Sequence, residues 1–457
     1  MPIKRFGNTG WLKWLPVFAL MMALLAGCAD QGSGEPITLP DSDLLARMER
    51  KSGLIAYIGV DGNVYTINQG GGNQHALTSD AVIPEADTGD LQVYQTPLWS
   101  PDGQQVAFIG LTADDAGITQ TSILVADANG KNAVSVYSSQ SEFPVFLGWA
   151  PDGSSVSFIT QSQLRNSFLF QHVDAKGEGE AQILDVGAPL FWDWGAAGNM
   201  LLNADGAVQN GPAPRLSILD PANAEVEDRL EIQPAYFSAP AWSPDEARML
   251  AAVRATEGDV QLVIANHWGE IEETISTLSG EAAFDWSPDG QMIAYVASDT
   301  FTADGIVGPL TVVDANDPAT IISATDAPVI AFFWSPNSKQ IAYFAAVQIL
   351  PDPESEAAED APPPEDQPLR LALFLLDLKS GESRQMAIFR PTELFTNTLR
   401  FFDQYQRAAT IWSPDSQNVV ISGFSSEGTP GIWVVPTSGR IGPRFITPGL
   451  MAFWSWK

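Results

Sequence analysis

Short runs of apolar residues recur along the chain from residue 54 onward, and Gly, Pro, Asn or Asp separates them. Runs of four or five residues that are apolar at consecutive positions are typical of strands buried on both faces. The pattern therefore predicts an all-β protein in which each sheet lies between two others. The predicted strands include 54–58, 64–67, 75–78, 106–109, 123–126, 262–265, 292–295, 310–313, 341–344 and 451–454.

A Trp-Ser-Pro-Asp-Gly motif punctuates these strands. Complete copies begin at Trp99 and Trp286, and the copy at Trp149 has Ala in place of Ser. Copies without the final Gly begin at Trp242, Trp334 and Trp412, a worn copy begins at Trp194, and Trp454 begins a truncated one. These Trp residues are 42 to 50 residues apart, except for 78 between Trp334 and Trp412. That period is typical of a four-stranded propeller blade.

The motif has the chemistry of a tight turn between two antiparallel strands. Pro fixes φ near −65°, Asp tolerates the next position, and Gly adopts the positive φ that closes the turn. The hydroxyl of Ser can hydrogen-bond to backbone amides in the same turn. A calcium-binding role is disfavoured because each Asp belongs to a different blade. The Asp residues, interpreted as turn residues, are Asp102, Asp152, Asp245, Asp289 and Asp415.

The ends of the repeat complement each other. Runs 54–58, 64–67 and 75–78 supply a second, third and fourth strand with no first, and 451–454 is a first strand with nothing after it. Pairing them would close the ring and remove exposed sheet edges. The fold prediction is therefore an eight-bladed β-propeller over 54–457. Seven blades is the alternative. It would require dismissing the copy at Trp194, and the long interval between Trp149 and Trp242 would then contain no blade.

The Trp-Ser-Pro-Asp-Gly repeat resembles the TolB-type, or WD40-like, β-propeller repeat of bacterial envelope proteins. The resemblance covers about residues 54–457 and implies the fold rather than a function, because the motif residues form turns and pack between blades. The chain departs from TolB in having no folded N-terminal domain. It also has no Gly-x-Ser-x-Gly elbow, which argues against a propeller-bearing serine peptidase.

The first 27 residues have the layout of a secretory signal: Lys4, Arg5 and Lys13 precede an apolar run of 14 residues that ends at Gly27. The run is shorter than the roughly 20 residues that span a bilayer. The end of the run, Leu25-Ala26-Gly27-Cys28, resembles the lipobox of bacterial lipoproteins, which implies cleavage between Gly27 and Cys28 and acylation of Cys28. Residues 28–53 are predicted to form a tether, with a short helix possible near its end. The resemblance places the protein in the cell envelope, on the cytoplasmic or the outer membrane.

Composition limits the possible functions. The 457 residues carry a formal charge of −32, which argues against nucleic-acid binding and against a basic membrane-binding patch. The single Cys excludes internal disulfides and Cys-based metal sites. His75, His172 and His267 fall in three different blades, so they are not expected to share a metal ion. We therefore predict no cofactor, no metal and no enzymatic activity.

Long segments fall on one predicted face of the disc, at 112–121, 204–214, 298–308, 347–368 and 391–407. Segment 351–368 has seven acidic residues and six Pro, and is expected to be disordered. Segment 391–407 has helical apolar spacing, and is either a helix packed on the disc or a docking element for a partner. The candidate partner face consists of Phe395, Arg400, Phe401, Phe402, Tyr405 and Arg407.

Two functions remain. The favoured one is a non-enzymatic, lipid-anchored scaffold that binds an envelope protein or peptide through its elaborated face, because loops on a rigid fold commonly carry binding sites. The alternative is binding or processing of a small molecule or a glycan at the mouth of the channel, which would require carboxylates or a metal to converge there.

Overall fold

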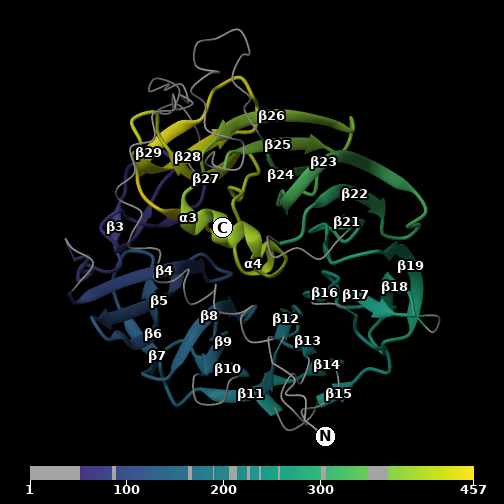
Figure 1. The fold of residues 1–457 in the computed structure, drawn as a ribbon, viewed down its shortest axis with the longest axis horizontal. Helices are drawn as coiled ribbons and strands as arrows, with labels where there is room; N and C mark the ends of the chain where they lie inside the picture. The colour runs from purple at the N-terminus through teal and green to yellow at the C-terminus, as the bar shows by residue number, and fades with distance from the viewer. Residues whose placement is uncertain are drawn as a thin grey trace, which may run out of the picture.

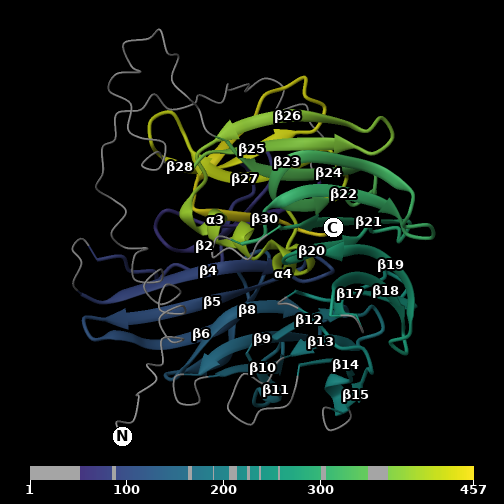
Figure 2. The same cartoon turned by 45° about the vertical axis from the view of Figure 1, so that its right-hand side comes forward.

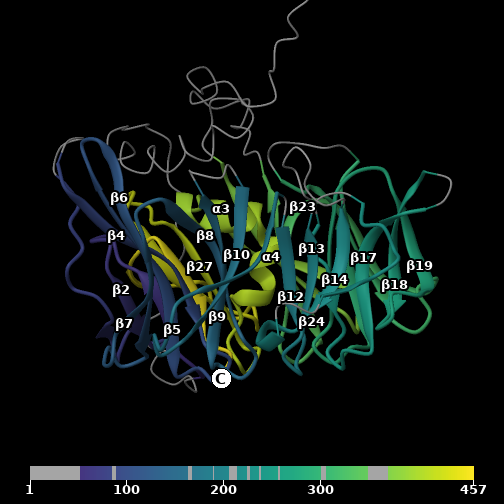
Figure 3. The same ribbon diagram turned by 90° about the horizontal axis from the view of Figure 1, so that it is seen from below.

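The computed structural model describes residues 52–84, 89–162, 167–188, 190–204, 214–223, 227–235, 238–255, 258–299, 305–347 and 369–457. The signal peptide, Cys28, the tether up to residue 51 and the acidic segment 351–368 lie outside these ranges. Antiparallel sheets follow one another in chain order around a common centre, as the blades of a propeller do (Figure 1). Viewed from the edge, the sheets form a disc (Figure 3).

Four of the sheets are built from four consecutive strands each. In each of them the first strand ends at a Trp of the repeat, as the sequence predicts. The strands are β4 (Leu91–Trp99), β5 (Gln105–Asp114), β6 (Gly117–Asp127) and β7 (Val134–Ser139); β8 (Glu142–Trp149), β9 (Ser155–Ser162), β10 (Ser167–Asp174) and β11 (Gln182–Gly187); β12 (Leu190–Trp194), β13 (Met200–Ala204), β14 (Arg215–Leu219) and β15 (Glu227–Arg229), with the short helix η2 (Pro221–Asn223) before β15; and β16 (Ala241–Trp242), β17 (Arg248–Arg254), β18 (Val260–Asn266) and β19 (Ile271–Leu278).

A fifth four-stranded sheet joins distant parts of the chain. It contains β1 (Ile55–Ile58), β2 (Val64–Ile67), β3 (His75–Ala76) and β30 (Met451–Trp454). Strand β30 pairs with β1 in antiparallel register, with Ile55 opposite Trp454 and Ile58 opposite Met451. The predicted pairing of the first and last runs is therefore present.

Two sheets depart from the four-stranded pattern. One sheet has seven strands, because β23 pairs through its first half with β22 and through its second half with β24. Figure 2 shows these strands from the side. The strands of this sheet are β20 (Ala282–Trp286), β21 (Met292–Ala297), β22 (Gly308–Asp314), β23 (Ile321–Trp334), β24 (Gln340–Ala346), β25 (Leu371–Asp377) and β26 (Glu382–Phe389). The other sheet has only β27 (Asn418–Phe424), β28 (Pro430–Pro436) and β29 (Arg444–Pro448).

The predicted first strand ending at Trp412 is reduced to isolated bridges. Thr410 bridges to Trp454, and Trp412 bridges to Val419. The chain has little room for a strand here, because helix α4 (Phe402–Ala408) ends directly before this segment. Helix α4 follows α3 (Glu393–Arg400), and both helices lie at the centre of the disc (Figure 1).

Segment 112–121, predicted as one of the long segments on the elaborated face, belongs largely to two strands. Strands β5 and β6 continue through it as a hairpin, with Thr112 opposite Gln120 and Asp114 opposite Gly117. The segment consists mainly of small and polar residues, among them Thr112, Thr119 and Gln120, which suits a ladder exposed to water. In the part of the chain that the structure describes, no helix is long and apolar enough to cross a membrane.

Candidate functional site

The repeat turns are held by a hydrogen-bonded pair of side chains. Ser287 Oγ donates to Asp289 Oδ1 at 2.7 Å and accepts the backbone N–H of Met292 at 2.9 Å. The same Ser–Asp bond forms at 2.6 to 2.7 Å between Ser100 and Asp102, Ser243 and Asp245, and Ser413 and Asp415. Each of these Asp side chains is therefore used inside its own turn. Within the described ranges, no group of three or more His, Cys, Asp or Glu residues is arranged to hold a metal.

Hydrogen bonding to the turn holds the pKa of Asp245 below its usual value. The hydroxyl of Ser243 makes the largest contribution, and the backbone N–H of Ala247 adds to it. Asp152, whose turn has Ala150 in place of Ser, accepts instead from the backbone and hydroxyl of Ser154, and its pKa is lowered for that reason. These carboxylates stay ionised and cap the turns.

Four Trp residues of the repeat connect neighbouring sheets through their indole N–H groups, whereas those of Trp194, Trp242 and Trp334 have no partner among the described residues. The indole N–H of Trp149 donates to the carbonyl of Leu98 at 3.0 Å, and that of Trp412 donates to the carbonyl of Phe333 at 2.9 Å. In each case the acceptor is the residue directly before the Trp of an adjacent sheet. Trp99 and Trp286 repeat the arrangement by donating to Phe453 and Ala241. Burial of the indole and this bond give the Trp positions a structural role.

Helices α3 and α4 fill the middle of the disc rather than standing on its surface. Phe395 and Phe402 are buried, and their rings pack edge-on against Phe344 and Phe332 of the surrounding strands. Tyr405 is also buried and packs against Phe146, and burial raises its pKa to about 12. These three members of the predicted partner face are therefore core residues. The helical spacing in segment 391–407 reflects packing inside the ring.

Arg407 is likewise an internal residue. Its guanidinium donates to the carbonyls of Pro240, Ala239 and Phe284, which ties α4 to the strand ends around it. Its Nε lies 3.9 Å from Asp285 Oδ1. Arg407 positions the helix and is not available to a partner. The more accessible of the six candidate residues are Phe401, which lies between the helices and is 49% exposed, and Arg400 at the end of α3, which is partly exposed; only 9% of the Arg407 side chain is accessible.

Three carboxylates surround Arg407, and all three resist ionisation. Burial raises the pKa of Asp193, Asp285 and Asp403, and the positive charge of Arg407 opposes this rise without cancelling it. The pKa of Asp285 reaches about 7. Protein atoms enclose this carboxylate on most sides, although 22% of its side-chain surface is accessible. One guanidinium is thus shared by three carboxyl groups whose pKa values are all raised.

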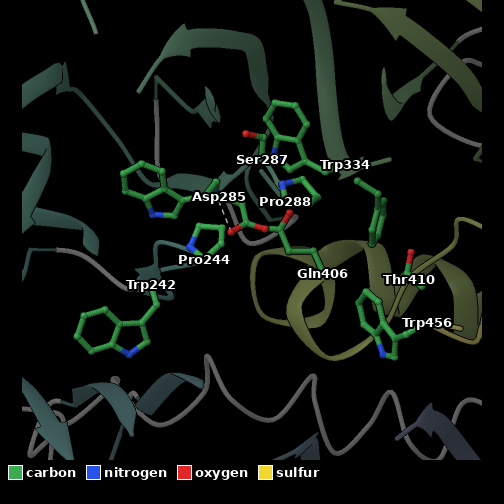
Figure 4. A pocket seen from close by; sticks show the side chains of 11 residues that line it. Trp242, Pro244, Asp285, Ser287, Pro288, Trp334, Gln406, Thr410 and Trp456 are labelled. Atoms are coloured by element: carbon green, nitrogen blue, oxygen red, sulfur yellow. Dashed lines mark hydrogen bonds between the residues drawn. The ribbon is translucent and has the colours of Figure 1, made fainter. Parts of the chain in front are cut away.

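The accessible side of Asp285 lines a pocket of about 180 Å³ (Figure 4). The pocket opens among the Ser-Pro turns, because Pro244, Ser287 and Pro288 belong to its rim, and α4 supplies Gln406 from within. It therefore lies on the face of the short turns, opposite the face where the binding site is predicted. The remaining lining residues are Trp242, Trp286, Phe333, Trp334, Thr410 and Trp456.

Sequence reasoning missed Asp193, Asp285 and Gln406. One signal was available: the residue before the repeat Trp is Asp in Asp193-Trp194 and Asp285-Trp286, but it is apolar or small in the other six copies, namely Leu98, Gly148, Ala241, Phe333, Ile411 and Phe453. A charged residue in a position that is otherwise apolar or small suggests a functional group or a buried ion pair. No signal indicated that Gln406 would lie beside Asp285.

The three His residues occupy separate places, as predicted. His75 is in β3, and His172 is in β10, where its Nδ1 lies 3.3 Å from Ser157 Oγ. His267 is in the turn between β18 and β19 and stacks against Trp242, with ring centroids 5.5 Å apart. The Gly70-Gly71-Gly72 segment is a turn in which Asn68 accepts backbone N–H bonds from Gly70 and Gly72.

The radial arrangement of antiparallel sheets makes the chain a β-propeller protein. No protein-family model matches it, and neither does any curated protein. Similar solved structures include TolB from Acinetobacter baumannii, with 17% identity, a TM-score of 0.36, and coverage of 58% of this chain and 62% of that one. The chain thus spans less than two thirds of TolB. An oligogalacturonate lyase in complex with manganese (13% identity, TM-score 0.48, 85% and 98% coverage) and the Dos1 propeller (9%, 0.48, 93% and 97%) are also similar.

Proposed function

We propose that this protein is a non-enzymatic, lipid-anchored component of the bacterial cell envelope whose eight-bladed propeller binds another envelope protein or a peptide. Eight blades follow if the seven-stranded sheet is counted as two blades that share β23, and if residues 410–412 complete the three-stranded sheet. The binding site in this proposal is the face that carries the second-to-third strand loops and the connections between sheets.

The distribution of exposed apolar side chains supports this choice of face. Val60 lies in the turn between β1 and β2, and Val82 and Ile83 lie in the connection from β3 to β4. Phe401 and Leu369 also belong to segments of this face, and all five side chains are 44 to 49% exposed. Among the described residues the opposite face has three such residues: Trp268 in the turn before β19, and Ile271 and Ile321 at the starts of β19 and β23. Apolar residues gathered on one face mark interaction surfaces.

Point variants of Phe401 and Arg400 test the proposed binding face. Deleting 391–407 would not be a suitable test, because it would remove the helices that fill the centre of the fold. The full-length protein is crosslinked in its native membranes, the captured protein is purified, and its affinity is then measured by titration. Phe401→Ala combined with Arg400→Ala should weaken binding at least tenfold, as expected for an aromatic contact at the centre of an interface.

Trp268→Ala is the matched control, since it removes an exposed aromatic ring from the other face and should change the affinity less than twofold. Equal affinity of all three proteins, or a loss caused by Trp268→Ala alone, would contradict the proposed face. The double variant and Trp268→Ala should both unfold at the same temperature as the parent, because none of the three altered side chains is buried.

The anchor is a separate part of the proposal and rests on Leu25-Ala26-Gly27-Cys28. The parent protein should incorporate radiolabelled palmitate and sediment with membranes. Cys28→Ala should lose both properties, because the thiol is the acceptor of the lipid and the chain carries too much negative charge to be held by anionic headgroups. Cys28→Ser is a second variant with nearly the same size; labelling of either variant would refute acylation at this residue.

A further inference from the structure

The pocket on the short-turn face contains hydrogen-bonding groups that the protein does not use. Gln406 is 8% exposed, and neither its Oε1 nor its Nε2 has a partner among the described residues. Burying an amide without partners costs about 1 to 3 kcal/mol. Figure 4 shows the Gln406 side chain reaching from α4 toward Asp285. An unpaired amide beside a carboxyl group in a pocket indicates a position prepared for a ligand.

Asp285 leaves part of its carboxylate free for such a ligand. Its Oδ1 accepts the backbone N–H of Trp286 at 2.9 Å and is 3.9 Å from Arg407 Nε. No partner of Oδ2 is found within the described ranges. Thr410 Oγ1 accepts the backbone N–H of Trp412 at 3.0 Å and has a second lone pair available. The pocket therefore offers three acceptor oxygens, from Asp285, Gln406 and Thr410.

The walls of the pocket are partly polar and partly apolar. The apolar part includes atoms of four Trp and two Pro residues: Trp242, Trp286, Trp334, Trp456, Pro244 and Pro288. Indole faces attract cations through the ring quadrupole. One of these rings is already used in this way, since the guanidinium of Arg248 lies 5.0 Å from the centroid of Trp286.

The charge around the pocket determines whether an anion, a neutral molecule or a cation is the favoured ligand. Arg407 faces Asp285 from α4, and Arg248 lies over Trp286; the carboxyl groups of Asp403 on the same helix and of Asp193 on β12 have pKa values raised by burial, as Asp285 has. The formal charge of the whole chain is −32. This potential repels anions, gives no preference to neutral molecules, and concentrates cations at the pocket.

We propose that the pocket at the short-turn end of the propeller channel binds a small organic cation through a primary ammonium group. Asp285 and Gln406 would accept N–H bonds from the ammonium, and its alkyl chain would lie among the Trp and Pro side chains that line the pocket. The volume of about 180 Å³ suits a chain of four to six carbons, since a cavity of about 150 Å³ admits benzene. The site is independent of the protein partner proposed above, because it opens on the opposite face.

The test is titration of the full-length protein with n-butylammonium chloride at pH 8, followed by calorimetry and by Trp fluorescence. Sodium butyrate and 1-butanol are the matched anionic and neutral probes, and both should bind at least tenfold more weakly. Equal binding of 1-butanol would overturn the proposal, because the pocket would then be only apolar. Tighter binding of tetramethylammonium would overturn the assignment to a primary ammonium group.

Three variants locate the binding site. Asp285→Asn should weaken n-butylammonium binding at least tenfold, and Gln406→Leu should weaken it severalfold. Asp415→Asn removes the same charge from a turn on the same face and should change the affinity less than twofold. Circular dichroism and thermal unfolding establish that each variant is folded. Unchanged affinity in folded Asp285→Asn and Gln406→Leu would exclude this pocket.

The dependence of binding on pH gives an independent readout. The pKa of Asp285 is about 7, because burial raises it against the opposing effect of Arg407. The carboxyl group is therefore mostly protonated at pH 5 and must lose its proton to hold a cation, while the alkylammonium stays charged throughout. Affinity should fall about a hundredfold from pH 8 to pH 5 in the parent and stay level in Asp285→Asn. A level profile in the parent would contradict a role for Asp285.

Discussion

Three residues with positive φ replace the Gly of the repeat turn, and each makes a bond that Gly cannot make. Ser338 and Ser416 have φ of 56° and 59°, and their hydroxyls accept the backbone N–H groups of Asp289 and Asn337 in an adjacent repeat turn, at 3.0 and 3.2 Å. Glu246, with φ of 56°, accepts the backbone N–H of Ala197 in the same manner. The strain of a left-handed residue is thus offset by a bond between sheets.

Substitution of Ser338 separates these two effects. Ser338→Ala removes the hydroxyl and keeps a side chain at positive φ, so the free energy of unfolding should fall by about 1 kcal/mol. Ser338→Gly removes the same bond but also relieves the strain of about 1 kcal/mol, so its stability should stay close to that of the parent. Urea unfolding measures both.

Gly153→Ala is the matched control for the strain alone. Gly153 has φ of 71°, and a Cβ atom there would meet nothing within 4 Å. Gly153→Ala should therefore lower the free energy of unfolding by about 1 kcal/mol, and the backbone conformation would be the sole cause. If Ser338→Gly were as destabilising as Ser338→Ala, the positive φ would carry no cost and the account of these turns would be wrong.

At the scale of elements, local patterns predicted what local interactions determine. The runs 64–67 and 451–454 match β2 and β30 residue for residue, because turn chemistry and apolar runs are properties of a few neighbouring residues. The hairpin of β5 and β6 was underestimated, since exposed Thr and Gln residues extend a ladder without adding apolar character. The sequence also does not predict that β23 pairs with both β22 and β24, because each half of β23 has the pattern of an ordinary strand.

Helices α3 and α4 show where prediction from sequence ends. Phe395, Leu399 and Phe402 have helical spacing, and all three are buried in the structure. The spacing indicates an apolar face but not what covers it. Whether the surrounding strands can cover this face depends on the width of the ring centre, and that width depends on how all the sheets are arranged. The pocket could not be predicted for the same reason: Asp285 and Gln406 meet only because α4 enters the ring.

At the scale of the whole molecule, stability depends on how the sheets are held to one another around the disc. Trp454 belongs to the junction where the last described strand pairs with the first. It is fully buried, its indole donates to the carbonyl of Ser52 at 2.7 Å, and its backbone N–H donates to Thr410 at 2.8 Å. Trp454 thus ties β30 to the start of the described fold through its side chain and to the segment after α4 through its backbone.

Trp454→Ala should therefore lower the free energy of unfolding by about 3 to 5 kcal/mol, the range for removal of a large buried aromatic side chain. Trp268→Ala makes the same chemical change at a site that is 76% exposed, and should alter stability by no more than about 0.5 kcal/mol. Thermal and urea unfolding of the two variants measure the difference. If Trp454→Ala cost less than about 1 kcal/mol, the pairing of β30 with β1 would not hold the disc together, and the sheets would have to be stabilised independently of one another.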